Sequence, residues 1–151
     1  MLLPTSKDTQ GPHAKKFIRV YVNKVGEKQM TTRKNPRFPV GSVIVKQKLP
    51  LNSKVSKTKF RKVSPAPELL TVMIKHKAGY DPKNGDWEYM VTDGAGRKVS
   101  QRGQIESCQN CHRPYAKTDY VVRSYLPKEV RIALNDLNAV EAQSKNRSEE
   151  K

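Results

Sequence analysis

Hydrophobic and polar residues alternate in several short segments of this chain, a pattern typical of β-strands. Four such segments are rich in β-branched and aromatic residues and cover residues 17–22, 42–48, 69–75 and 87–92. A fifth strand is predicted at residues 97–100, after a hairpin turn signal at Asp93-Gly94-Ala95-Gly96. The part of the chain before residue 100 is therefore rich in strands.

Helical spacing of apolar residues appears at two places. A short helix is predicted at residues 25–30, ending before Asn35-Pro36. Pro127 suits the first turn of a longer helix. Its apolar residues, which we expect to pack on the sheet, are Val130, Ala133, Leu134, Leu137 and Val140.

These elements divide the chain into one domain and two tails. We expect residues 1–16 to form an N-terminal tail, residues 17–143 to form the domain, and the charged residues 144–151 to be disordered. Within the domain, residues 50–67 form a long basic loop with three prolines. Loops of this length are uncommon in compact domains and tend to be functional or flexible.

Two of the predicted strands carry a positive charge in mid-strand. Arg19 shares a face with Phe17 and Tyr21, so it either reaches water from a sheet edge or points into a ligand pocket. Lys46 shares a face with Ser42 and Ile44. Taken alone, the pattern around Lys46 is typical of a lysine on a solvated face.

Composition narrows the classes of partner. The net charge of +16 and the pI near 10.0 favour acidic partners, such as nucleic acid, an anionic membrane surface or an acidic protein. The basic residues are spread along the chain, and the densest run, residues 54–62, is typical of a solvated loop. No helix-turn-helix, RNP-type strand or zinc-finger spacing supports nucleic-acid binding. No apolar run approaches the roughly 20 residues that span a membrane.

The strongest chemical signal is Cys108-Gln109-Asn110-Cys111-His112, which has the C-x-x-C-H spacing of c-type haem attachment. Cys108 and Cys111 would form thioethers with the porphyrin vinyl groups, and His112 would be the proximal iron ligand. Both cysteines of the chain lie in this motif. Three alternatives remain: a zinc site that adds His13 and His76, a redox-active thiol pair, and a structural disulfide.

The position of the motif limits the kind of haem protein. No methionine follows His112, so a methionine ligand would have to come from Met30, Met73 or Met90 upstream. We expect instead an open iron position at which a small molecule binds and reacts. Haem c is attached outside the cytoplasm, and residues 1–4 are no signal peptide. We therefore infer that an export segment is missing from this chain.

Five segments resemble the cytochrome P-460 family in that family's order, over residues 11–127. They are GPHAKKFIRVYVN, FPVGSVIVKQKL, GYDPKNGDWEYMV, IESCQNCH and KTDYVVRSYLP. The resemblance implies an α+β fold: a mainly antiparallel β-sheet with a few helices packed around one covalently bound c-type haem. It also implies a periplasmic homodimer that oxidises hydroxylamine, a haem-dependent oxidoreductase with nitric oxide and nitrous oxide as products. An acidic redox partner protein is expected from the charge of the chain.

Members of this family carry a lysine bonded to a meso carbon of the porphyrin, and Lys46 in VIVKQK matches it. Arg19 in FIRVYVN resembles the arginine of the family's distal pocket. Active members also need a group that moves protons there, and Gly103 and Glu106 occupy the segment before Cys108. The alternative is a protein similar to the beta-type cytochromes c-prime, which lack the lysine link. Such a protein binds nitric oxide or transfers electrons without catalysis, and Phe17, Phe38 and Phe60 are available to cap its iron.

Overall fold

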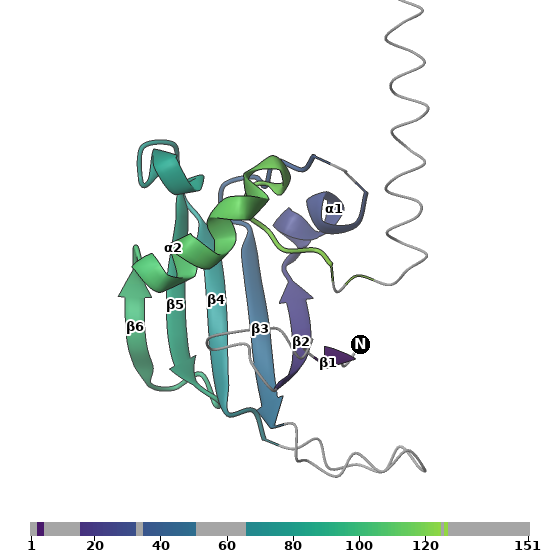
Figure 1. Cartoon of the computed structure of the whole chain (residues 1–151), viewed down its shortest axis with the longest axis vertical. Coiled ribbons are helices and arrows are strands. Elements are labelled where there is room, and N and C mark those ends of the chain that lie inside the picture. Colours follow the sequence, from purple (N-terminus) through teal and green to yellow (C-terminus); the bar gives the residue numbers. More distant parts are fainter. Residues whose placement is uncertain (1–2, 5–15, 33–34, 51–65, 125, 127–151) are drawn as a thin grey trace, which may run out of the picture.

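The computed structural model describes residues 3–4, 16–32, 35–50, 66–124 and 126. These residues form one antiparallel sheet whose strands lie in chain order, β1 to β6 (Figure 1). The strands are β1 (Leu3–Pro4), β2 (Lys16–Val22), β3 (Val43–Pro50), β4 (Leu69–Lys75), β5 (Trp87–Asp93) and β6 (Val99–Gly103). Each strand pairs with the next one along the chain.

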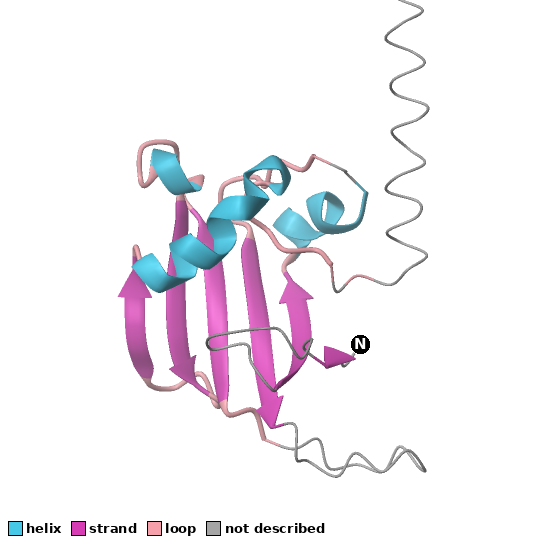
Figure 2. Ribbon diagram, in the orientation of Figure 1, coloured by secondary structure: helices cyan, strands magenta, loops and turns pink. Residues whose placement is uncertain are grey.

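The helices cover one face of this sheet. Figure 2 shows α2 (Glu106–His112) crossing in front of the sheet and α1 (Lys24–Thr32) at the upper ends of β2 and β3, with the 3₁₀ segments η2 (Pro82–Asn84) and η3 (Arg113–Thr118) near the same end of the strands. The core cluster between the two layers is formed by Met30, Phe38, Ile44, Met73, Trp87, Tyr89 and Val121. The predicted α+β class with a mainly antiparallel sheet is therefore confirmed.

Most predicted strands agree with the structure because their alternation is local. The strand predicted at residues 69–75 coincides with β4, and those at 17–22, 42–48 and 87–92 match β2, β3 and β5 within two residues at either end. The helix predicted at 25–30 lies inside α1. The last strand was placed too early, because Asp93 accepts hydrogen bonds from the amides of Arg97 and Lys98 and extends the turn to residue 98.

Some predictions fall outside what the structure tests. The helix expected from Pro127, the tail at 144–151 and residues 51–65 of the basic loop lie outside the described residues. Sequence reasoning missed β1, whose Leu3 and Pro4 pair with Ile18 and Phe17 of β2 inside the segment expected to be a tail. In the described part of the chain, no helix has the length and apolar character to span a bilayer.

Candidate functional site

The C-x-x-C-H motif forms helix α2. Cys108 and Cys111 are three residues apart, so they project from neighbouring positions on one side of this helix. Both thiols are free, and Cys111 is exposed. Glu106 in the first turn places a negative charge at the helix N-terminus, which favours helix formation.

His112 is the last residue of α2, and its ring orientation is fixed by the backbone. Its Nδ1 lies 2.6 Å from the carbonyl oxygen of Tyr120. Because a carbonyl oxygen only accepts hydrogen bonds, Nδ1 carries the hydrogen and donates it. Nε2 therefore keeps its lone pair, the arrangement seen in metal-binding histidines.

The electrostatic surroundings of His112 keep its ring neutral. The residue is 6% exposed. Burial, and then the positive charge of Lys46, lower the pKa of His112 to about 4. The imidazole is therefore unprotonated at neutral pH, which is the form that binds a metal ion.

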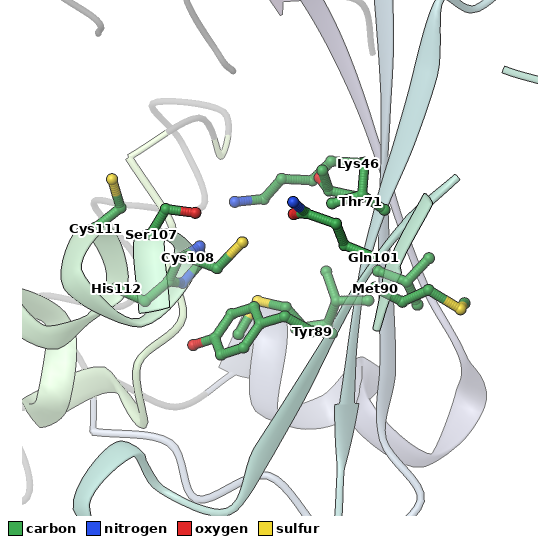
Figure 3. A pocket seen from close by; sticks show the side chains of 13 residues that line it. Lys46, Thr71, Tyr89, Met90, Gln101, Ser107, Cys108, Cys111 and His112 are labelled. Atoms are coloured by element: carbon green, nitrogen blue, oxygen red, sulfur yellow. The ribbon is translucent and has the colours of Figure 1, made fainter. Parts of the chain in front are cut away.

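A cavity of about 150 Å³ lies between α2 and the sheet (Figure 3). Side chains from four strands and from α2 line it, among them Lys46, Thr71, Tyr89, Gln101, Ser107, Cys108, Cys111 and His112. In Figure 3 Lys46 reaches from the sheet toward α2, and the Cys108 thiol points back toward the sheet. Gln101 and Cys111 are exposed, so the cavity opens to solvent along this edge.

Lys46 is buried in the middle of β3, with Val20 and Thr71 as its neighbours on the adjoining strands. Its exposed fraction is 7%, so the expectation of a solvated lysine, taken from its strand alone, is wrong. Burial lowers the pKa of Lys46 from 10.5 to about 8, although negative charge at Cys108 opposes the shift. Roughly a tenth of this amine is therefore neutral, and nucleophilic, at pH 7.

Arg19 lies on the other face of the sheet. The register of β2 and β3 pairs Arg19 with Gln47, whereas Val20 lies opposite Lys46. Directly opposed residues point to the same face and successive residues to opposite faces, so Arg19 points away from the cavity. The structure therefore places Arg19 on the opposite face of the sheet from Lys46, and its expected role in the distal pocket stays a prediction.

The structure adds residues that sequence reasoning did not single out. Tyr89 is 3% exposed, and its ring centre lies 5.4 Å from that of His112. Its buried hydroxyl finds no hydrogen-bond partner among the described residues. Burial raises the pKa of Tyr89, so the hydroxyl keeps its proton at neutral pH. Tyr89 and Thr71 sit on the same face as Lys46, but this follows only once the strand register is known.

Two other residues considered for the haem pocket lie elsewhere in the structure. Glu106 is exposed and does not line the cavity. Phe38 packs in the core with its ring centre 5.6 Å from that of Trp87, while Phe60 lies outside the described residues.

Gln109, one of the two residues between the cysteines, anchors α2 to the rest of the fold. Gln109 is buried, and its Nε2 donates to the Asp81 carboxylate at 2.7 Å. Asn84 donates to both oxygens of the same carboxylate, at 3.1 and 2.9 Å. Buried hydrogen bonds to a charged acceptor are among the stronger ones in proteins. They tie α2 to the turn before β5.

In the described part of the chain, no metal-binding cluster supports the zinc alternative. His76 is 2.7 Å from the Glu88 carboxylate and stacks on Tyr80, with 4.3 Å between ring centres. Within the described ranges, no group of three or more histidine, cysteine, aspartate or glutamate residues is placed to hold a metal ion. His13 lies outside those ranges.

The donor set fits a haem. Two thiols project from one side of a helix, a neutral imidazole follows with its Nε2 available, and a buried tyrosine hydroxyl has no protein partner among the described residues. The enclosed volume is smaller than a porphyrin, but the cavity opens at the edge formed by Cys111 and Gln101. The chain matches the protein family described as Cytochrome P460 over residues 3–123. No curated protein matches the chain.

Proposed function

This chain belongs to the cytochrome P460 family, and from that premise we propose that it is a periplasmic c-type haem protein that binds and oxidises hydroxylamine. Family membership makes it a haem-binding cytochrome. We propose in addition that the haem is attached covalently, that hydroxylamine is the substrate and that the protein is periplasmic. The observation that carries it is the geometry of α2, where two thiols precede a histidine whose Nδ1 is held by the Tyr120 carbonyl.

In this proposal the motif residues hold the cofactor. The thiols of Cys108 and Cys111 would each hold the haem through one vinyl group, with a carbon–sulfur bond formed and the thiol hydrogen taken up by the other vinyl carbon. His112 would hold the iron through Nε2. The haem would supply the redox chemistry for oxidising a small nitrogen compound.

Lys46 is the proposed cross-linking residue, which sets this family apart from ordinary c-type cytochromes. A bond from its Nζ to a meso carbon would replace one N–H and one C–H bond, so two electrons and two protons would have to leave. Hydrogen peroxide would accept both and become two waters. The lowered pKa of Lys46 supports this role, since only the neutral amine has the lone pair that forms the bond.

The other polar side chains of the cavity would orient the bound nitrogen compound. Gln101 offers an amide, and Thr71 and Ser107 offer hydroxyls that both donate and accept hydrogen bonds. Oxidation of hydroxylamine releases protons together with electrons. These hydroxyl and amide groups would hold the compound at the open edge, where water can take up the protons.

A second candidate function is binding of nitric oxide, or electron transfer, without catalysis. No carboxylate lies among the described residues that line the cavity, and Arg19 faces the opposite side of the sheet. A pocket that lacks both groups has fewer means of moving protons from a substrate. These observations are the grounds for the second candidate.

We also propose a redox partner protein and assembly with a second copy of the chain. The net charge of +16 supports docking of an acidic redox protein. Assembly as a homodimer and location in the periplasm are proposed from the resemblance to the family.

Haem staining after a denaturing gel tests the attachment. The full-length protein, exported in a host with haem c maturation machinery, should give a stained band, and a Cys108→Ser, Cys111→Ser double variant should not. A colourless band together with stoichiometric zinc in the native protein would exclude the haem proposal.

Turnover separates the two candidate functions. The holoprotein is mixed with hydroxylamine and an artificial electron acceptor, and reduction of the acceptor is followed by absorbance. Oxidation predicts reduction that depends on hydroxylamine and is lost in Lys46→Ala. Nitric oxide binding without any acceptor reduction would select the second candidate.

A further inference from the structure

We propose that Asp119 is a positioning residue for His112: its carboxylate holds a left-handed turn whose next carbonyl, that of Tyr120, orients the imidazole. The inference rests on the proposed function, because it takes His112 as the iron ligand. Asp119 itself does not line the cavity. It would act on His112 only through the backbone carbonyl of Tyr120.

Three hydrogen-bonding groups from distant parts of the chain converge on Asp119, which is 4% exposed. The Lys75 ammonium lies 2.8 Å from both carboxylate oxygens. The amide of Phe38 donates to Oδ2 at 2.8 Å. The indole Nε1 of Trp87 donates to the Asp119 carbonyl at 2.8 Å. The side chain and the backbone of Asp119 are thus both held by β4, β5 and the segment before β3.

The turn that Asp119 holds has an unusual backbone. Asp119 and Tyr120 have φ values of 53° and 63°. Two successive left-handed residues other than glycine are unfavourable, and such conformations persist where the surroundings over-determine them. The hydrogen bonds that converge on Asp119 hold its backbone in this conformation.

Tyr120 is held from its other side by the turn before β5. The Tyr120 hydroxyl donates to the carbonyl of Lys83 at 3.0 Å. Its ring occupies the space where a Cβ on Gly85 would lie, only 2.5 Å away. Gly85 in turn accepts a hydrogen bond from the Lys75 ammonium at 2.7 Å. Lys75 therefore contacts both Asp119 and the surface on which Tyr120 rests.

The consequence is a fixed carbonyl 2.6 Å from His112 Nδ1. A strong hydrogen bond at this nitrogen makes the imidazole a better electron donor through its other nitrogen. It would strengthen the iron–histidine bond and favour the ferric state. The ion pair of Asp119 and Lys75 would thereby tune the iron although neither side chain lines the cavity.

The test compares Asp119→Asn with Glu88→Gln in the haem-loaded protein. Each replaces a buried carboxylate that forms an ion pair, with side-chain exposures of 5% for Asp119 and 8% for Glu88. Glu88 binds Arg102 and His76, and neither is a partner of Tyr120 or His112. The readouts are the iron–histidine stretching frequency of the ferrous protein and its midpoint potential.

We expect Asp119→Asn to lower the stretching frequency and shift the potential to more positive values, because the hydrogen bond to Nδ1 loosens. Glu88→Gln should change neither, even if it lowers the melting temperature equally. Lys75→Met should change the frequency and the potential in the same directions as Asp119→Asn. Lys75→Arg keeps the charge, so its frequency and potential should stay close to those of the unaltered protein.

A folded Asp119→Asn protein with unaltered frequency and potential overturns the inference. If that variant does not fold, Trp87→Phe, which removes the indole donor to the Asp119 carbonyl and keeps the Asp119 carboxylate, decides. A shift in the same direction supports the inference, and no shift overturns it. Failure of the proposed function looks different: either no haem is bound, or His112→Ala leaves the spectrum of the bound haem unchanged.

Discussion

The protonation state of Lys46 should set how fast its bond to the porphyrin forms. A pKa of about 8 leaves roughly a tenth of this amine neutral at pH 7. That fraction is roughly three hundred times the fraction expected for a lysine at the ordinary pKa of 10.5. The rate should therefore rise about tenfold per pH unit below pH 8 and level off above it.

The assay begins with protein that carries haem but has not been treated with an oxidant. A peroxide is added at a series of pH values from 6 to 10, and the absorption change is followed with time. Peptide mass mapping then shows whether the peptide that contains Lys46 carries the haem together with the peptide that contains Cys108 and Cys111. Lys46→Arg is the matched control, because a guanidinium stays protonated over this range and should form no link.

Two results would refute this reasoning. A Lys46 peptide released without modification at every pH would show that the link is absent and would favour the nitric-oxide-binding alternative. A rate that keeps rising up to pH 10 would show that the amine behaves as an exposed lysine, against its burial of all but 7% of its surface.

Three further outcomes follow from the same geometry. His112→Ala should alter the absorption spectrum of the bound haem through loss of the axial nitrogen, and an unchanged spectrum would reject the ligand assignment. Arg19→Gln should leave the spectrum unchanged and any hydroxylamine-dependent rate within about twofold of the unaltered protein, because the side chain lies on the far face of the sheet. A loss of activity as large as that expected for Lys46→Ala would contradict that placement. While Lys46 is unlinked, the unfolded chain binds its proton more tightly than the folded one between pH 8 and 10.5, so the free energy of unfolding should rise by about 3 kcal/mol across that window. Denaturant titrations at both ends of the window should show this rise, and Lys46→Met should show less of it.

Local patterns were enough to predict most strands of the sheet and the helix α1, but not β1 or α2. Alternation of side chains is a property of one strand, so residues 69–75 and 87–92 could be assigned without knowledge of their neighbours. The spacing of Cys108, Cys111 and His112 is equally local, and a single helix carries all three residues. The strand pattern of Lys46 indicated a solvated face, and only the resemblance to a family singled it out as a residue of the haem site.

The tertiary structure decided which residues meet. Arg19 and Lys46 were both charged residues in strands, and only the pairing of Val20 with Lys46 shows that Arg19 faces the other way. The sequence alone indicates neither the Tyr120 carbonyl as the partner of His112 nor the support that Asp119 receives from Lys75 and Trp87. The physical reason is that a strand's faces follow from its own backbone, whereas the register between strands depends on how distant side chains pack. A change of one residue in that register would exchange the residues that line the cavity with those on the opposite face.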